Sequence, residues 1–175
     1  MKILHLLAVF LTFTVAALAS SSPPAPPSGG GSGSNAPSSR EKDAPELSFY
    51  NDGVKLLFQK KWAEAQKQFE AAVAINEKMA EGHNNLAYVL RKQGAQNFEK
   101  SLAHYNRALE LKPKMAEACM YRGVLHLFMG HPDLAKADHE TLVKMRSKLA
   151  PHLQKVIDTG KEEEPEQFYG VNKKK

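Results

Sequence analysis

Small residues recur at a nearly constant spacing along the middle of the chain. Gly53, Ala87 and Gly123 lie 34 and then 36 residues apart, and each is followed by a second small residue in the next amphipathic segment: Ala65, Ser101 and Ala135. Two antiparallel helices approach closely only where neither carries a bulky side chain. Because self-similarity at a period of about 20–50 residues is typical of stacked repeats, the spacing predicts three helical hairpins.

Apolar residues between these points follow the period of an amphipathic helix. They recur at spacings of three and four, as in Leu86, Val89 and Leu90, whereas a half-buried strand would alternate apolar and polar residues. Gly94 follows this run, and glycine commonly ends a helix. Pro132 stands where a later segment begins, and proline is tolerated there because its missing N–H has no partner in that position anyway. Since one hairpin cannot bury its apolar face alone, we predict that the hairpins stack.

This pattern resembles the tetratricopeptide repeat family over residues 46–149. Besides the small residues, the resemblance rests on the aromatic residues Phe69 and Tyr105 and on Pro113, which precedes the third unit. It implies an all-α fold, in which three antiparallel helix-turn-helix hairpins stack as a short right-handed solenoid. The units implied are 46–79, 80–115 and 116–149. The chain departs from the family four residues before each small residue, where the usual tryptophan is replaced: Phe49, His83 and Cys119.

The first 19 residues have the features of a secretory signal peptide. A positive charge at Lys2 precedes an uncharged, mostly apolar run, and the small residues Ala17 and Ala19 then form a cleavage pattern. We therefore expect an exported protein, with a bacterial periplasm as the favoured location. Secretion by another route and an uncleaved N-terminal anchor are the alternatives. Residues 20–45 are rich in Ser, Pro and Gly, so we expect a disordered linker there.

A further helix and a charged tail follow the repeats. A terminal repeat exposes an apolar face that needs a cover, and we predict a capping helix over residues 150–160. We expect residues 161–175 to form a charged tail, because Pro165 and a run of glutamates interrupt the helical pattern. The capping helix is indicated by four apolar residues at helical spacing: Leu149, Leu153, Val156 and Ile157.

The resemblance also implies where a partner binds. In tetratricopeptide domains the first helix of each hairpin lines a concave groove. Amide side chains there suit the backbone of an extended or helical peptide, and tyrosines add contact area with a polar tip. The alternative is that several of these side chains only pack between neighbouring hairpins. The matching positions in this chain are Tyr50, Asn51, Asn84, Asn85, Tyr88, Arg91, Met120 and Tyr121.

Some members of the family hold a peptide's terminal carboxylate with a clamp of Lys, Asn and Arg residues. Only Asn85 matches that clamp in this chain. We therefore do not expect the chain to bind the C-terminal tails of chaperones. The other clamp positions carry different residue types: Tyr50, Val54, Glu117 and Tyr121.

The sequence lacks the motifs of an enzyme, so we expect no catalytic residues, no metal and no cofactor. There is no glycine-rich phosphate loop and no paired-cysteine or His-Glu-x-x-His metal motif. His126, His131 and His139 straddle a turn without the spacing of helical metal ligands. Cys119 falls on an apolar helix face, where we expect a small buried hydrophobe rather than a nucleophile.

Charge and fold together favour a protein partner. The formal net charge is +5, but no basic stripe with interleaved aromatic residues is present, so we expect no nucleic-acid partner. We predict a non-catalytic scaffold of the cell envelope or secretory space that binds a peptide or protein in its groove, with no stable membrane span once the signal is cleaved. A self-assembling structural protein and an accessory subunit of an envelope complex are the alternatives.

Overall fold

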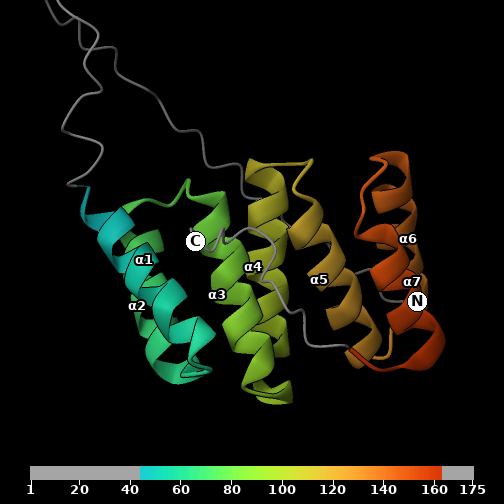
Figure 1. Cartoon of the computed structure of the whole chain (residues 1–175), viewed down its shortest axis with the longest axis horizontal. Helices are drawn as coiled ribbons and strands as arrows, with labels where there is room; N and C mark the ends of the chain where they lie inside the picture. Colours follow the sequence, from blue (N-terminus) through green and yellow to red (C-terminus); the bar gives the residue numbers. More distant parts are fainter. Residues whose placement is uncertain (1–43, 163–175) are drawn as a thin grey trace, which may run out of the picture. The chain divides into compact units, whose positions relative to one another are not determined.

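The computed structural model describes residues 44–162, which fold as helices without a strand in this part of the chain (Figure 1). The predicted signal peptide, all but the last two residues of the predicted linker, and residues 163–175 lie outside the described residues. The elements are α1 (Pro45–Phe58), α2 (Trp62–Ile75), α3 (Ala80–Lys92), the short 3₁₀ turn η2 (Ala95–Asn97), α4 (Phe98–Leu111), α5 (Ala116–Phe128), α6 (Pro132–Lys144) and α7 (Ala150–Thr159).

The helices pack in chain order as antiparallel pairs. The most extensive contacts join α1 to α2, α3 to α4, and α5 to α6, and successive pairs then pack against each other, as Figure 1 shows. The first helices of the pairs also touch one another, α1 with α3 and α3 with α5, whereas α2, α4 and α6 make no such contacts among themselves in the described part. Because α1, α3 and α5 lie closer together, they form the inner layer of the stack.

The turn inside each hairpin uses one residue with a left-handed backbone. Gly94 and Gly130 follow α3 and α5 with φ of 115° and 80°, as glycine after a helix predicts. The first hairpin has Lys60 at the corresponding position, with φ of 58°. A residue with a β-carbon is strained in this region, at about 1–2 kcal/mol relative to an ordinary backbone, so the first turn is the less favourable of the three.

Small residues allow close helix approach, although not always against the predicted partner. In the second hairpin the Ser101 hydroxyl donates a hydrogen bond to the Ala87 carbonyl at 2.7 Å, which confirms that predicted contact. A β-carbon on Gly123 would lie 2.6 Å from Cδ2 of Leu153, in α7. The nearest neighbour of Gly123 across the packing is therefore α7 rather than the predicted Ala135.

Helix α7 packs on both helices of the third hairpin. It contacts α5 and α6, and it buries Leu153 and Val156 against them. The helix ends at Gly160, which has φ of 67° and turns the chain out of the helical path. This helix thereby covers part of the apolar surface of the last hairpin, while Leu134 and Val143 of α6 stay exposed. None of the described helices combines the length and the apolar character that crossing a membrane requires.

Candidate peptide-binding site

Arg91, in the last turn of α3, forms a largely buried ion pair on the inner layer. Its Nη1 and Nη2 atoms donate hydrogen bonds to the two carboxylate oxygens of Glu162 at 2.8 and 2.7 Å. The exposed fractions of the two side chains are only 1% and 12%. Lys92 Nζ lies 3.8 Å from the same carboxylate. Such a bidentate, charge-assisted pair is the strong form of carboxylate recognition, since two parallel hydrogen bonds fix the geometry.

Aromatic rings surround the Arg91 guanidinium. Its central carbon lies 5.3 Å from the ring centre of Tyr88 and 5.7 Å from those of Tyr121 and Phe128. Tyr88 and Tyr121 also meet edge to face, with centroids 5.1 Å apart. A cation near aromatic faces is attracted by the ring quadrupole, most strongly where water is excluded. The rings therefore hold the guanidinium in one place, with its edge directed at the Glu162 carboxylate.

A separate set of polar contacts links the first half of α3 to α1. Asn84 Nδ2 donates to Asn85 Oδ1, and Asn85 Nδ2 donates to the Tyr50 hydroxyl, each at 3.1 Å. Some buried atoms of the inner layer have no hydrogen-bond partner: Asn84 Oδ1, Arg91 Nε and the Tyr121 hydroxyl. An unsatisfied buried polar group costs about 1–3 kcal/mol. The inner layer thus offers donors and acceptors that the described residues leave unused.

The predicted groove residues do come together on the inner layer, but most of them are not open to solvent. Their burial fits the alternative that several of them pack between neighbouring hairpins, and their binding of a partner stays a prediction. Asn51 is exposed and Tyr50 is half-buried. The remaining six are buried, with exposed fractions of 2–6%: Asn84, Asn85, Tyr88, Arg91, Met120 and Tyr121.

Sequence reasoning missed two residues of this site. Glu162 belonged to the predicted charged tail, and Phe128 was one apolar residue among several on its helix. Phe128 could have been predicted from the repeat register. It lies two residues before Gly130, as Lys92 lies two residues before Gly94. Glu162 carried no such signal, since its pairing with Arg91 spans 71 residues.

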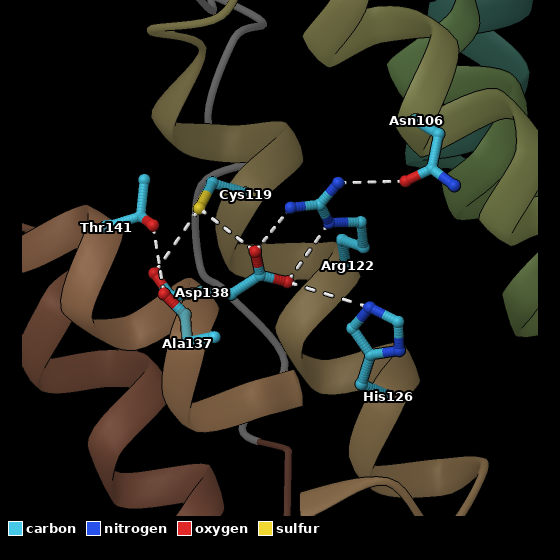
Figure 2. A network of polar contacts seen from close by, with 7 residues as sticks. All are labelled: Asn106, Cys119, Arg122, His126, Ala137, Asp138 and Thr141. Atoms are coloured by element: carbon cyan, nitrogen blue, oxygen red, sulfur yellow. Dashed lines mark hydrogen bonds and ion pairs between the residues drawn. The ribbon is translucent and has the colours of Figure 1, made fainter. Parts of the chain in front are cut away.

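A second polar cluster joins α4, α5 and α6, and Figure 2 shows it from close by. The buried carboxylate of Asp138 accepts hydrogen bonds from Arg122 at Nη2, 2.6 Å, and Nε, 3.1 Å. Arg122 Nη1 also donates to Asn106 Oδ1 at 2.8 Å. His126 Nε2 lies 3.9 Å from the same carboxylate. The arginine neutralises Asp138 and fixes three helices to one another, which is a structural role.

Cys119 lies at the edge of the second cluster, and its chemistry is suppressed. Its thiol donates to the Asp138 backbone carbonyl at 3.4 Å and lies 3.6 Å from the carboxylate (Figure 2). Burial, with a further contribution from the Asp138 charge, raises the pKa of the Cys119 thiol to about 12. A protonated, buried thiol is a poor nucleophile. In the described part of the chain, His, Cys, Asp and Glu side chains form no group that suits a metal ion.

A surface pocket of about 310 Å³ lies between the first two hairpins. Two of its lining residues, His83 and His104, approach within 3.0 Å through their Nδ1 atoms. His83 Nε2 lies 3.1 Å from the Glu77 carbonyl. A carbonyl only accepts, so His83 carries its proton on Nε2, and His104 must donate its Nδ1 proton to His83. Three of the four ring nitrogens therefore already have partners.

Comparison with known sequences gives limited matches. No family model matches the chain. It is 28% identical over 95 residues to the photosystem I assembly protein Ycf3 of Synechococcus elongatus, an alignment that covers 53% of this chain and 54% of that protein. A second Synechococcus strain has a protein of the same name with the same identity and coverage. The chain thus spans about half the length of the curated relatives it matches.

Comparison with solved structures defines the fold. The second tetratricopeptide domain of Spaghetti (RPAP3), bound to the HSP90 peptide SRMEEVD, matches with a TM-score of 0.56 and 22% identity over 61% of this chain and 96% of that one. The tetratricopeptide domain of Arabidopsis OM64 matches with a TM-score of 0.60 and 18% identity, and the match covers 67% of this chain and 97% of that one. The second tetratricopeptide domain of human RPAP3, in complex with the HSP70 peptide SGPTIEEVD, matches with a TM-score of 0.59 and 22% identity. This match covers 66% of this chain and 96% of that one. The described helices therefore have the tetratricopeptide fold.

Proposed function

We propose that this chain is a non-catalytic protein-interaction module whose inner layer binds a peptide through an acidic side chain. The observation that carries the proposal is the bidentate pair of Arg91 with the Glu162 carboxylate inside an aromatic surround. An arginine fork selects planar carboxylates over other groups. A partner with a glutamate or aspartate at the matching place would make the same two hydrogen bonds.

Other polar side chains of the inner layer suit the backbone of such a peptide. Asn84 has an unused buried acceptor and Tyr121 an unused buried hydroxyl, and both lie on inner helices. Peptide N–H and C=O groups are their natural partners, because a peptide that enters a buried surface must satisfy its own backbone groups. Amide and hydroxyl side chains would therefore orient the ligand, while Arg91 supplies the charge-specific contact.

The structures with the same fold support a peptide ligand in general terms. Two of them hold chaperone peptides that end in EEVD. In this chain the positions of the family's carboxylate clamp retain only Asn85, and that side chain is bonded to Tyr50. We therefore propose recognition of an acidic side chain at Arg91, which is a different position, rather than recognition of a chaperone tail.

The N-terminal sequence supports a proposal for where the module works. The N-terminal pattern of charge, apolar run and small residues supports export, and we propose the bacterial periplasm as the place where the module works. Secretion outside the cell or retention by an uncleaved N-terminal anchor are the alternatives. The partner is accordingly an envelope or extracytoplasmic protein.

Self-association is a second candidate function, favoured by the surface of α1. Leu47 and Phe49 are exposed, each to 37%, and they lie on α1, whose packed neighbours among the described helices are α2 and α3. An end helix with exposed apolar residues suits a second copy of the chain as well as a different protein. Light scattering of the chain without its signal peptide distinguishes self-association from binding of a different protein. A chain that stays monomeric throughout the micromolar range does not self-associate.

Selection of peptides from a random display library tests the proposed function. The target is the chain from residue 20 to 175, immobilised at its N-terminal end. We expect enrichment of peptides that contain Glu or Asp near an aromatic residue, with micromolar dissociation constants. Arg91→Gln should weaken the selected peptides at least tenfold, because the carboxylate loses both hydrogen bonds and its counter-charge.

The matched control is Arg107→Gln, which removes an arginine that is paired with Glu110 on the exposed side of α4. This variant should bind the selected peptides as the unaltered chain does. Circular dichroism of both variants checks that the helices persist. Enrichment of peptides without acidic residues, or equal affinities for the Arg91→Gln and Arg107→Gln variants, would contradict the proposal.

A further inference from the structure

We propose that the surface pocket between the first two hairpins binds the guanidinium group of an arginine from a partner protein. This inference goes beyond the proposed function, because the pocket is lined from α2, α4 and the part of α3 up to Leu86, whereas Arg91 lies in the last turn of α3. The pocket has a volume of about 310 Å³, at the lower end of the range for ligand pockets. It therefore suits one side chain rather than a longer segment.

The repeat register relates this pocket to the polar cluster at the next junction, between the second and third hairpins. The first helices of these hairpins correspond at the spacing of their small residues, which is 36 residues. Leu86 in the pocket therefore corresponds to Arg122 in the cluster, and His83 corresponds to Cys119. The two junctions are thus built from equivalent positions of α3 and α5.

The second helices extend the correspondence. The small residues of α2, α4 and α6 are separated by 36 and then by 34 residues. Glu70 of α2 accordingly corresponds to Asn106 of α4, and His104 of α4 corresponds to Asp138 of α6. Both Asn106 and Asp138 belong to the cluster at the next junction (Figure 2), so each polar member of that cluster has an equivalent in the lining of the pocket or beside it.

At the next junction an arginine of the chain itself lies among these residues. Arg122 donates through Nη1 to Asn106 Oδ1 at 2.8 Å, and through Nη2 and Nε to the Asp138 carboxylate at 2.6 and 3.1 Å (Figure 2). The leucine at position 86 cannot make such bonds, and a pocket lies beside it. The second junction is therefore an internal example of how the first can hold a guanidinium.

The pocket presents hydrogen-bond acceptors at the two corresponding positions. Glu70 has a carboxylate where Asn106 has an amide oxygen. His104 donates its Nδ1 proton to His83, so its Nε2 atom is an acceptor, and none of the described residues bonds to it. Burial lowers the pKa of His104, which keeps the ring neutral at pH 7.5. Each junction therefore combines one carboxylate with one neutral acceptor.

The charges around the pocket favour a cation. Glu70 and Glu77 line it with two carboxylates. Arg107 lines it as well, but its guanidinium is paired with Glu110 at 3.0 Å. Both imidazoles of the lining are neutral at pH 7.5, because burial lowers their pKa. A guanidinium is preferred over a lysine ammonium, since its planar fork can reach two acceptors at once.

Titration of the chain from residue 20 to 175 with the tripeptide Gly-Arg-Gly, blocked at both ends, tests the site. Nuclear magnetic resonance at pH 7.5 follows the imidazole signals of His83 and His104, which line the pocket. We expect both signals to shift, with a dissociation constant in the millimolar range. The same peptide with citrulline, which has the shape of arginine without its charge, should bind at least fivefold more weakly, because the charge-assisted hydrogen bonds are lost.

Substitutions at exposed positions then locate the site. Glu70→Gln combined with Glu77→Gln should weaken the arginine peptide at least fivefold, because both carboxylates of the pocket are removed. Ala74→Phe, at an exposed residue of the lining, places a ring at the pocket and should abolish the shifts. The matched control is Glu140→Gln, at an exposed position of α6, which should bind the peptide as the unaltered chain does. Circular dichroism checks that every variant keeps its helices.

Three results would overturn the arginine site. The first is imidazole signals that the arginine peptide does not move, and the second is equal binding of the arginine and citrulline peptides. The third is an affinity that the paired glutamate substitution or Ala74→Phe leaves unchanged. Each of these outcomes leaves the proposed function standing, because that function depends on Arg91 and on acidic peptides, and it fails separately if library peptides do not require Arg91.

Discussion

A β-carbon on Gly53 would lie 2.8–3.0 Å from three ring atoms of Phe69. Phe69 is completely buried in the first hairpin, and real β-carbons essentially never make contacts as short as the nearest of these. The small residue at position 53 therefore makes room for a ring two helical turns along α2 rather than for a second small residue. The close approach of α1 and α2 depends on this pair.

Gly53→Ala should destabilise the domain by about 1 kcal/mol. Alanine is favoured over glycine inside a helix by up to about 1 kcal/mol, but overpacking a core costs about 1–3 kcal/mol, and the Phe69 ring is completely buried. Urea unfolding followed by circular dichroism measures the change. Adding Phe69→Leu to Gly53→Ala should cost less than the two single changes together, and strict additivity would argue against the contact.

Lys60→Gly should stabilise the domain by about 1 kcal/mol. Lys60 has a left-handed backbone at the turn where the other two hairpins have Gly94 and Gly130, and glycine adopts this conformation without steric cost. Lys67→Gly is the matched control, because Lys67 is exposed in the middle of α2, where glycine should destabilise by about 1 kcal/mol. If urea unfolding showed that both variants are stabilised or that both are destabilised, the assignment of strain to this turn would be contradicted.

The helices and their stacking could be predicted because the signals are local and repeated. Ala87 and Ser101 face each other across the second hairpin, as their spacing predicts, and a hydrogen bond joins them. Gly94 ends α3 as its residue type indicates. The partner of Gly123 could not be predicted, because the capping helix supplies Leu153 from outside the repeat. Periodicity identifies which residues recur, not which side chain fills each gap.

The candidate site was only partly predictable. The register placed Arg91, Tyr88 and Tyr121 on one layer, and the structure brings them within 6 Å of each other. Their burial could not be anticipated, because it involves a carboxylate that is distant in the sequence and follows the last helix. A lone glutamate in a charged tail carries no pattern that specifies its partner.

Stability should fall as the pH drops below about 6.5. Burial lowers the pKa of His83 and of His104, and for His104 the neighbouring imidazole acts in the same direction. The unfolded chain then binds more protons than the folded one, so stability is full above the unfolded pKa of about 6.5 and is lost as the pH falls through the lowered folded values. Urea unfolding at pH 7.5 and at pH 5.5 measures the loss.

His104→Gln should reduce that loss, because it removes one titrating imidazole while an amide can still donate to His83. Ala63→Gln, at an exposed position of α2, introduces the same amide without removing a titrating group; it is the control and should leave the difference between the two pH values unchanged. His126 contributes in the same direction, since burial lowers its pKa as well. Equal stability of the unaltered domain at both pH values would contradict the lowered histidine pKa values.

The Cys119 thiol should resist modification while the domain is folded. Burial raises its pKa to about 12, so at pH 8 almost no thiolate is present and the sulfur is inaccessible. A chromogenic disulfide reagent should react with less than one thiol in ten molecules within minutes in buffer, and with one thiol per molecule in urea. Stoichiometric reaction in buffer would show that hairpin three opens readily or that the thiol is exposed.

The proposed function depends on recognition of a ligand carboxylate by Arg91 on the inner layer. Calorimetric titration in a double-mutant cycle tests it most directly, with an acidic library peptide, the same peptide with its key Glu replaced by Gln, and the unaltered and Arg91→Gln chains. The account predicts that the peptide change weakens binding at least tenfold to the unaltered chain and less than twofold to Arg91→Gln. An equal loss of affinity for both chains would show that the carboxylate is bound elsewhere, and would contradict the account.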